Sequence, residues 1–419
     1  MRTEPAVEWD VRYAPSVVAV GNVVFVSGCT CGRVGALAPR GVEEQVELAL
    51  EKARGALEAA GSGMENVVKT FFLLTSLDDY GRVRRTETEF YERHAPKLVA
   101  TPPAATLMVV PSVGRPELLV QYEVVAALDR DLPGWDVTYH PEHWAGKELA
   151  YPHVPKEHPK FARSQSIGNL LVVSGCQALD HETLRVEAAD FAGQCRVVLD
   201  KLRIAVEQPG GSLDNLVKTN VFVKDASALS VYRELERTFF REHAPGLASD
   251  PPASTAFVVS ELPRPEFLIE VEAFAVVDAG APGWPVRRRA GSPEAAESAT
   301  AGRLVFVSAC DAGAEGSAGG PIEREITAAL DTLGAALERA GSAIGRIVRL
   351  TLLLCDADDY PRLQRALDAH FGEHAPNLVE TPPATTFMQV PTVVPPGARF
   401  QLDAVAVSSD AVDEPAGGV

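Results

Sequence analysis

Three cysteines end the same short sequence, and they are the residues with the most obvious chemical potential. Cys29 ends VVFVSGC, Cys176 ends LVVSGC and Cys310 ends VFVSAC. A cysteine is a nucleophile only as the thiolate, so it needs a lowered pKa and a base within reach. A buried cysteine also packs as a small apolar residue. The sequence leaves both uses open and favours packing, because duplication copies a residue whether or not it reacts.

The sequence around these cysteines is repeated three times. The stretch at 61–80 is matched at 211–230 and 341–360, and HAPKLVATPPAAT at 94–106 is matched at 243–255 and 374–386. From Lys69 onward, the second copy lies 149 residues after the first and the third copy 280 residues after it, without a gap. The chain therefore contains three homologous units of about 120 residues, each large enough to be a domain.

Each unit has the same predicted order of elements. In the first unit we expect a strand pair at 17–27, a helix at 42–60, a buried strand in VVKTFFLLT, a helix at 77–94 and strands at 104–110 and 117–128. This ββαβαββ order predicts an α+β fold in which helices cover one face of the sheet. The other face must also be buried, and the neighbouring unit is the obvious partner.

The predicted domain limits follow from these matches. We expect repeats at 1–130, 161–279 and 299–408, a structured, aromatic connector at 131–160, a linker at 280–298 and a disordered tail at 409–419.

Composition limits the class of protein. The net charge of −18 argues against nucleic acid as a partner, because phosphate binding needs a Lys/Arg surface. No apolar run is long enough to span a membrane. The six cysteines, without a secretory signal pattern, predict reduced thiols in the cytoplasm. Neither the Cys29/Cys31 pair nor the histidines at 140–158 have the paired spacing of a zinc site, so we expect no metal and no cofactor.

Each unit resembles the Rid family of reactive intermediate deaminases, also called YjgF or endoribonuclease L-PSP-like. The resemblance rests on GNVVFVSG, on the VVKT segment before a strand, and on P-P-A-x-T followed by a strand ending in [YV]-E-x-x-A. It implies chorismate-mutase-like domains that form trimers with a ligand pocket at each subunit interface. This chain would then be an intramolecular pseudotrimer with three different pockets, which leaves any further assembly open.

The resemblance also implies a site residue that this chain lacks. The family's deaminases hydrolyse reactive imines and enamines and bind the substrate carboxylate through the arginine of a P-A-R-[ST] motif. The corresponding residues here are Ala105, Ser254 and Thr385. Because a guanidinium holds a carboxylate through two charge-assisted hydrogen bonds, its loss predicts weak or absent deamination of 2-imino acids.

The remaining candidate residues are carried over from the family pattern. Glu123 and Glu272, with Asp403 as a shorter counterpart, match an acid on the last strand that would position water or relay a proton; the alternative is a carboxylate that faces solvent or a backbone N–H. With Cys29 and Cys176, the two glutamates are the candidate catalytic residues. The candidate substrate-binding residues are Tyr13, Ser27, Gly28, Ala105, Thr106, Phe161, Ser174, Gly175, Ser254, Thr255, Cys310, Thr385 and Asp403.

These features predict a Rid-superfamily enzyme with altered chemistry. It would carry out hydrolysis, deamination, elimination or rearrangement of a reactive imine, enamine or enol-type intermediate, in a specialised biosynthetic pathway. Pockets built mainly from the first two repeats are the better candidates, because the third repeat has diverged furthest. The alternatives are a non-catalytic ligand-binding or scaffolding protein and a ribonuclease, which the negative charge disfavours.

Overall fold

The computed structural model describes residues 16–32, 38–129, 134–144, 147–148, 155–181, 183–313, 320–395 and 397–409. Tyr13, one of the predicted pocket residues, lies outside these ranges.

The three repeats have the predicted ββαβαββ order. Repeat one contains β1 (Val17–Val20), β2 (Val23–Cys29), α1 (Val42–Ala59), β3 (Val67–Leu74), α2 (Tyr80–His94), α3 (Pro96–Ala100), β4 (Ala104–Val109) and β5 (Val120–Ala127). Repeat two contains β9 (Ala162–Ile167), β10 (Leu170–Cys176), α4 (Phe191–Glu207), β13 (Leu216–Val223), α5 (Leu229–His243), α6 (Pro245–Ser249), β14 (Ala253–Val258) and β15 (Ile269–Val276), with the short strands β11 (Leu179–Asp180) and β12 (Arg185–Val186). Repeat three contains β17 (Ser298–Ala301), β18 (Leu304–Val307), α8 (Ile322–Arg339), β19 (Ile347–Leu354), α9 (Tyr360–His374), α10 (Asn377–Glu380), β20 (Ala384–Gln389), β21 (Thr392–Val393) and β22 (Phe400–Val407).

Local sequence accounts for the limits of these elements. Gly21 adopts φ +59° in the turn between β1 and β2, a conformation that suits glycine. The Ser76 hydroxyl accepts a hydrogen bond from the Asp78 backbone N–H (3.2 Å) at the start of the α2 region. Along α1 an apolar stripe that includes Val46, Leu50 and Leu57 is fully buried against the sheet.

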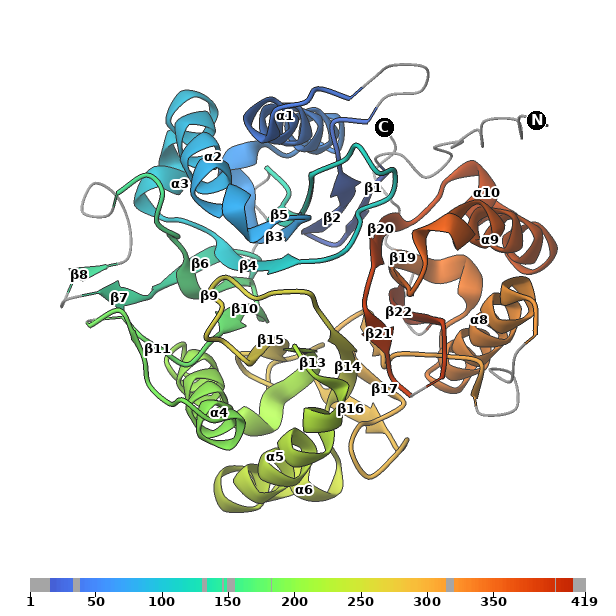
Figure 1. Cartoon of the computed structure of the whole chain (residues 1–419). Coiled ribbons are helices and arrows are strands. Elements are labelled where there is room, and N and C mark those ends of the chain that lie inside the picture. Colours follow the sequence, from blue (N-terminus) through green and yellow to red (C-terminus); the bar gives the residue numbers. More distant parts are fainter. Residues whose placement is uncertain are drawn as a thin grey trace.

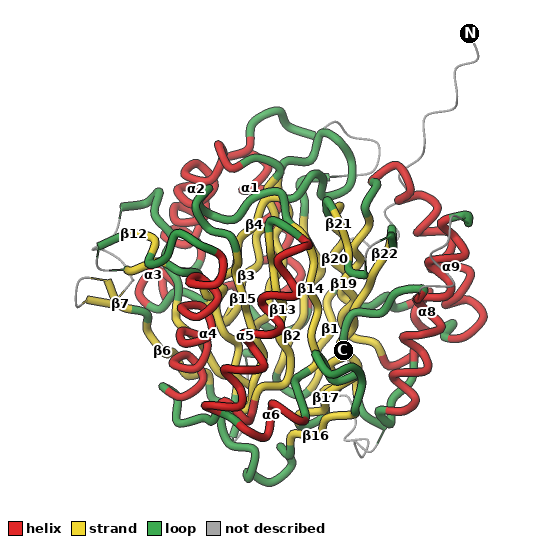
Figure 2. The backbone as a smooth tube through the Cα atoms, turned by 60° about the horizontal axis from the view of Figure 1, so that its bottom comes forward, coloured by secondary structure: helices red, strands yellow, loops and turns green. Residues whose placement is uncertain are grey.

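The central strands are buried on both faces, as the sequence predicts. Every residue of β3 and β13 is buried. One face packs under the helices of its own repeat, and the other packs against the neighbouring repeats. Figure 1 shows the consequence: the strands of the three repeats surround a common centre, and the helices lie on the outside. Figure 2 shows the same strands running through the middle of the molecule. The chain is thus a pseudotrimer built from one polypeptide.

The sheets of the repeats also join. In repeat one the strand order is β1-β2-β5-β3-β4, and β4 continues into repeat two through a parallel bridge between Ala104 and Ala162. β14 of repeat two pairs with β21 of repeat three. Within the described residues, the rest of repeat three forms a separate sheet with the order β16-β17-β18-β22-β19-β20.

Two apolar clusters hold the repeats together along the central axis. The first contains Phe25, Phe274 and Phe306, one from each repeat. The second contains Phe71 and Phe222 together with residues of β19 and β20. Because both clusters take members from all three repeats, no repeat can bury its inner face alone.

Each connecting segment adds one strand to the sheet of a repeat. β6 (Val137–Pro141) pairs with β9, while β7 (His143–Trp144) and β8 (Lys147–Glu148) form a separate two-stranded sheet. In the segment expected to be a linker, β16 (Val286–Arg289) pairs with β17. None of the described helices is long and apolar enough to cross a membrane.

Candidate active site at the repeat interfaces

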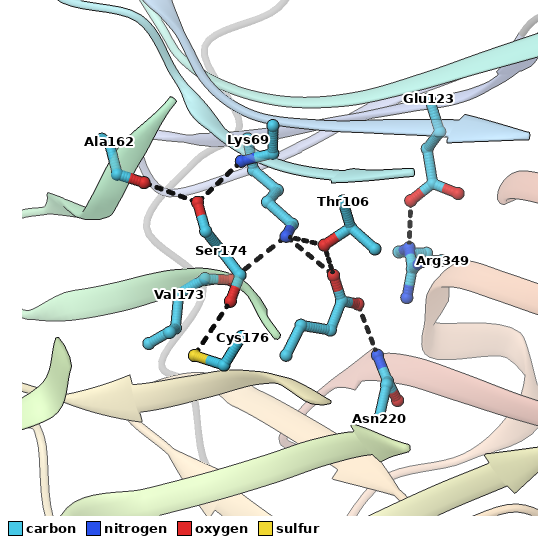
Figure 3. Close-up of polar contacts among 11 residues, drawn as sticks. Lys69, Thr106, Glu123, Ala162, Val173, Ser174, Cys176, Asn220 and Arg349 are labelled. Atoms are coloured by element: carbon cyan, nitrogen blue, oxygen red, sulfur yellow. Dashed lines mark hydrogen bonds and ion pairs between the residues drawn. The ribbon is translucent and has the colours of Figure 1, made fainter. Parts of the chain in front are cut away.

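Three ion pairs cross from one repeat to the next at the centre of the molecule. The Lys69 ammonium lies 2.7 Å from the Glu272 carboxylate of repeat two. Two counterparts complete a ring: Lys218 to Asp403 at 3.3 Å, and Arg349 to Glu123 at 2.7 Å. Both cations and acids are spaced by the repeat offsets, so we call this group the axial ring. Figure 3 shows Lys69, Glu123 and Arg349 within it.

Each carboxylate of the axial ring also accepts a hydrogen bond from a threonine of the preceding repeat. Thr106 donates to Glu272 and Thr255 donates to Asp403, both at 2.5 Å, and Thr386 donates to Glu123. Asn220 adds a bond to Glu272 at 2.8 Å. All three carboxylates are at least nine-tenths buried.

The buried partners shift the acidity of the ring. Burial alone would raise the pKa of Glu272, but the Lys69 ammonium and the hydrogen-bond donors bring it below its usual range. Lys218 and Arg349 likewise hold the pKa of Asp403 low. The predicted site residues Glu123, Glu272 and Asp403 are therefore charged groups that join the repeats, and a role in proton relay stays a prediction.

The serine of each SGC or SAC turn bonds to the first part of a strand in the neighbouring repeat, at Ala105, Ser254 or Thr385. The Ser174 hydroxyl accepts a hydrogen bond from the backbone N–H of Ala105 (2.9 Å). It also donates to the Ala162 carbonyl, a bond that Figure 3 shows. Ser308 does the same for Ser254 (2.8 Å). The Ser27 hydroxyl accepts from the Thr385 N–H at 3.0 Å. The structure thus brings these residues together in pairs, one pair at each interface; all of them except Ser308 were predicted pocket residues.

The cysteine of each turn points away from the interface. Cys29, Cys176 and Cys310 belong to the separate helix-covered cores of their own repeats. Each thiol lies 3.3–3.6 Å from the carbonyl of the serine two residues before it. Burial raises the pKa of all three thiols to about 12. This arrangement is that of a packing residue, and it keeps the nucleophilic thiolate scarce at neutral pH.

Glycine in the turn makes room for a side chain from the last strand. A Cβ atom at Gly175 would lie 1.7 Å from Oε1 of Glu270, and one at Gly28 would lie 2.4 Å from Cδ of Gln121. Ala309 takes this place in repeat three, where the counterpart Gln401 instead donates to the Val394 carbonyl. In repeats one and two, the glycine of the turn therefore leaves space at the interface for the side chain at this position of the last strand.

Glu270 is an acid that the sequence analysis missed. Its side chain is fully buried beside Gly175. Burial raises the pKa of its carboxyl to about 8. A hydrogen bond with Gln177 opposes the rise, the Glu272 carboxylate adds to it, and Lys69 and Arg84 of repeat one oppose it. At pH 7 Glu270 is therefore mostly protonated and can donate a proton.

Arg84 of α2 is the cation that repeat one contributes to the same interface. It is 4% exposed, and its guanidinium carbon lies 5.6 Å from the ring centre of Tyr80 and 5.7 Å from that of Phe72. Glu87 orients it through a 2.8 Å ion pair. Its Nε is buried and has no hydrogen-bond partner among the described residues. The guanidinium thus keeps an unused donor at the interface.

The three interfaces differ at these two positions. Between repeats one and two, the pair is Arg84 and Glu270. Between repeats two and three the corresponding residues are Arg233 and Gln401. Arg233 pairs with Glu236 (2.7 Å) and donates a hydrogen bond to Ser254 (2.8 Å). Between repeats three and one both positions hold glutamine, Gln364 and Gln121. At these two positions, only the interface between repeats one and two has both an arginine and a glutamate.

Phe161 lies apart from this pair. Its ring packs edge-on against His181 of its own repeat, with ring centres 5.6 Å apart. Burial lowers the pKa of His181 to about 4, so the ring beside Phe161 is neutral at pH 7.

Two signals in the sequence could have identified the missed residues. Arg84 and Arg233 each precede a glutamate by three residues on the otherwise apolar face of a helix. Charged residues are rarely buried unless they are paired, so their presence on a buried face indicates a specific interaction. Glu270 stands two residues before Glu272, on the same face of a strand. Sequence alone could not show that these groups meet, because they belong to different repeats.

A family profile and several known proteins match the repeats of this chain. The profile of the family described as endoribonuclease L-PSP matches residues 3–128, 153–277 and 296–408. The 2-iminobutanoate/2-iminopropanoate deaminase of Escherichia coli K12 is 32% identical over 130 residues, which is 31% of this chain and 97% of the relative. A RutC family protein of Pyrococcus abyssi is 31% identical over 121 residues, 29% of this chain and 89% of the relative. Among solved structures, the YjgF gene product of E. coli is 34% identical and covers 28% of this chain and 87% of its own, with a TM-score of 0.25.

Removing one charge of an axial ion pair should destabilise the protein strongly, and removing both charges should restore part of the stability. Lys69→Met leaves the Glu272 carboxylate buried without its cation, so we expect it to lower the free energy of unfolding by about 3–5 kcal/mol. The double variant Lys69→Met/Glu272→Met removes both charges and should recover much of that loss. Urea denaturation at pH 7 measures both, and a single variant within about 1 kcal/mol of the parent would contradict the structural role of the ring.

The turn cysteines should resist alkylation in the folded protein. Because burial raises the pKa of Cys29, Cys176 and Cys310 to about 12, we expect iodoacetamide at pH 8 to leave them unmodified. Cys355, which is only partly buried, provides the internal comparison. Peptide mass spectrometry before and after denaturation gives the result. Rapid native labelling of a turn cysteine would instead indicate an activated thiolate.

Proposed function

Because the chain belongs to the endoribonuclease L-PSP family through all three repeats, we propose that it is a small-molecule enzyme that hydrolyses a reactive imine or enamine at the interface between repeats one and two. The observation that carries this proposal is that a buried carboxyl group, Glu270, and a buried guanidinium, Arg84, both lie at this interface, where burial raises the pKa of Glu270 and the charge of Arg84 opposes the rise. The E. coli relative, a 2-iminobutanoate/2-iminopropanoate deaminase, supports the choice of substrate class.

Glu270 has the properties of a general acid for this reaction. Hydrolysis of an imine needs a proton on the nitrogen and a water molecule on the carbon; the carbinolamine that forms then breaks down to a carbonyl compound and ammonia or an amine. A carboxyl group with a pKa of about 8 holds its proton at pH 7 and can transfer it to the nitrogen. The resulting carboxylate can then take a proton from the attacking water. Gly175 is the residue that permits this placement.

Arg84 supplies the positive charge that the strand motif lacks. The small side chain of Ala105 replaces the family arginine on β4, and the helix arginine of the same repeat contributes a buried guanidinium to the interface. A guanidinium with a free Nε–H can hold a carboxylate or another anionic group of the substrate. The missing strand arginine predicts weak deamination of 2-imino acids, and Arg84 makes this one interface the exception.

The other two interfaces support a binding or scaffolding role. Neither has a carboxyl group at the Glu270 position, since Gln401 and Gln121 stand there. We therefore propose that one interface is catalytic and that the other two maintain the assembly. The ligand-binding or scaffolding alternative applies to those two. A ribonuclease is disfavoured by the net charge of −18. We also propose that the enzyme acts in a specialised biosynthetic pathway, a role that the fusion of three diverged units supports.

A matched pair of arginine variants tests the location of the site. Arg84→Ala should lower kcat/KM for a 2-imino acid about 10–100-fold, because a hydrogen bond to a charged group is worth about 1.5–3 kcal/mol. Arg233→Ala breaks the equivalent buried ion pair in repeat two and should leave kcat/KM unchanged. The substrate is generated in place by an amino acid oxidase, and its loss is followed against the buffer rate.

Stability measurements separate the two effects. Both variants leave a buried glutamate, Glu87 or Glu236, without its cation, so both should lose similar stability. Equal activity losses in the two variants would contradict a single site between repeats one and two, and so would an Arg84→Ala variant with full activity.

The pH dependence of the reaction should depend on Glu270. In the parent, activity that requires the protonated carboxyl should be retained below about pH 8 and fall as the pH rises through that value. Glu270→Gln keeps the shape of the side chain but cannot transfer the proton, so we expect a loss of about 10²–10⁴-fold and no alkaline decline in what remains. A Glu270→Gln variant with the parental pH profile would exclude Glu270 as the acid.

A further inference from the structure

We infer that repeat three carries a metal-binding site on its outer helices, formed by Asp331 of α8 and by His370 and His374 of α9. One potential ligand atom from each of the three residues lies within 4.8 Å of the others. His370 Nε2 is 3.1 Å from Asp331 Oδ1, and the two imidazole ring centres are 4.6 Å apart. The sequence analysis expected no metal and weighed cysteines and histidines elsewhere in the chain.

The spacing of the residues explains why they converge. His370 and His374 are four residues apart, so they lie on the same face of α9, one turn from each other. α8 packs along this helix and brings the Asp331 carboxylate to the pair. Figure 1 shows α8 and α9 together on the outer side of repeat three, away from the central strands. The site is therefore separate from the proposed catalytic interface.

The ligand set indicates the class of metal. Two imidazoles and one carboxylate suit Zn²⁺ or another divalent first-row metal ion, and three protein ligands leave room for water. His370 is 5% exposed and so is held in place by packing, whereas the side chain of Asp331 is 64% exposed and can adjust to an ion. Nδ1 of His370 is buried and has no hydrogen-bond partner among the described residues.

The other two repeats provide the strongest argument, because they lack one ligand. At the positions of Asp331, His370 and His374, repeat one has Glu51, Phe90 and His94, and repeat two has Asp200, Phe239 and His243. In both, the phenylalanine packs on the histidine, with ring centres 4.6 Å and 4.4 Å apart. The acid and one histidine are thus common to all repeats, and repeat three alone replaces the phenylalanine, which is buried in repeat one and half-buried in repeat two, by a second histidine.

A hydrogen bond between His370 and Asp331 explains only part of this arrangement. Such a bond needs one histidine, and burying an imidazole where phenylalanine packs in the other repeats costs free energy unless its polar atoms are used. A metal ion would use the imidazoles of both histidines and the carboxylate together. It would also fasten α8 to α9, which couples metal binding to the stability of repeat three.

The test is Zn²⁺ titration of the full chain after treatment with a chelator. We expect one ion to bind to the parent, measured by competition with a chromophoric chelator. His370→Phe restores the arrangement of the other repeats, so it should fold normally. Since losing even an outer partner of a metal ligand costs about 10–100-fold in affinity, losing His370 should weaken binding at least about 100-fold. Added Zn²⁺ should raise the Tm of the parent and leave that of His370→Phe unchanged.

Repeat one offers a gain-of-function control. Phe90→His places a second histidine beside His94 and Glu51, so this variant should bind one more Zn²⁺ than the parent. Parental affinity in His370→Phe would overturn the proposal, because binding would then come from other histidines. A parent without measurable binding at micromolar Zn²⁺ would overturn it too, leaving a histidine–aspartate hydrogen bond as the full account of these residues.

Discussion

The axial ring is the constraint on which the rest of the structure depends. Six charged side chains are buried at the centre of the molecule, and each finds its partner only in another repeat. A buried charge without its partner destabilises the folded protein. A repeat that moved out of place would leave a buried charge unpaired in each of the other two repeats. The two apolar clusters supply most of the attraction between repeats, but they are not directional. The ring fixes the relative positions of the repeats.

The ring also gives the assembly a direction. The cation of each repeat faces the acid of the next, so every interface has one side made by β4 and the second helix and another made by the serine turn and the last strand. Joining the three units in one chain lets the two sides of each interface change independently of the other interfaces. Arg84 and Glu270 stand on opposite sides of a single interface. In a trimer of identical chains the same two substitutions would appear at all three.

Much of the fold could be predicted from sequence because its causes are local. The β-branched and aromatic run in β3, the apolar stripe of α1 and the constant offsets between repeats are each visible within short stretches. The orientation of Cys29 could not be predicted, because the pairing of β2 with β5 shifts register between Val26 and Cys29. Ser27 faces the neighbouring repeat, whereas Cys29 faces the helix-covered core of its own repeat. Arg84 and Glu270 are about 190 residues apart, and only packing brings them together. The lysine in the VVKT strand was the clearest neglected sign, because a charge within a fully buried strand requires a buried partner.

Repeat three shows how a duplicated unit can change on one face and stay fixed on another. Its inner strands keep the charged residues of the ring, with Arg349 in place of lysine and Asp403 in place of glutamate. Its second helix has lost both members of the arginine–glutamate pair, since Gln364 and Leu367 stand there. The axial contacts are shared with the other repeats, so a change there disturbs the whole assembly. A change at the Arg84 or Glu270 position, or on the outer helices, affects one interface or one surface. The same separation allows the second helix to differ between repeats, with Arg84 and Arg233 in two of them and Gln364 in the third.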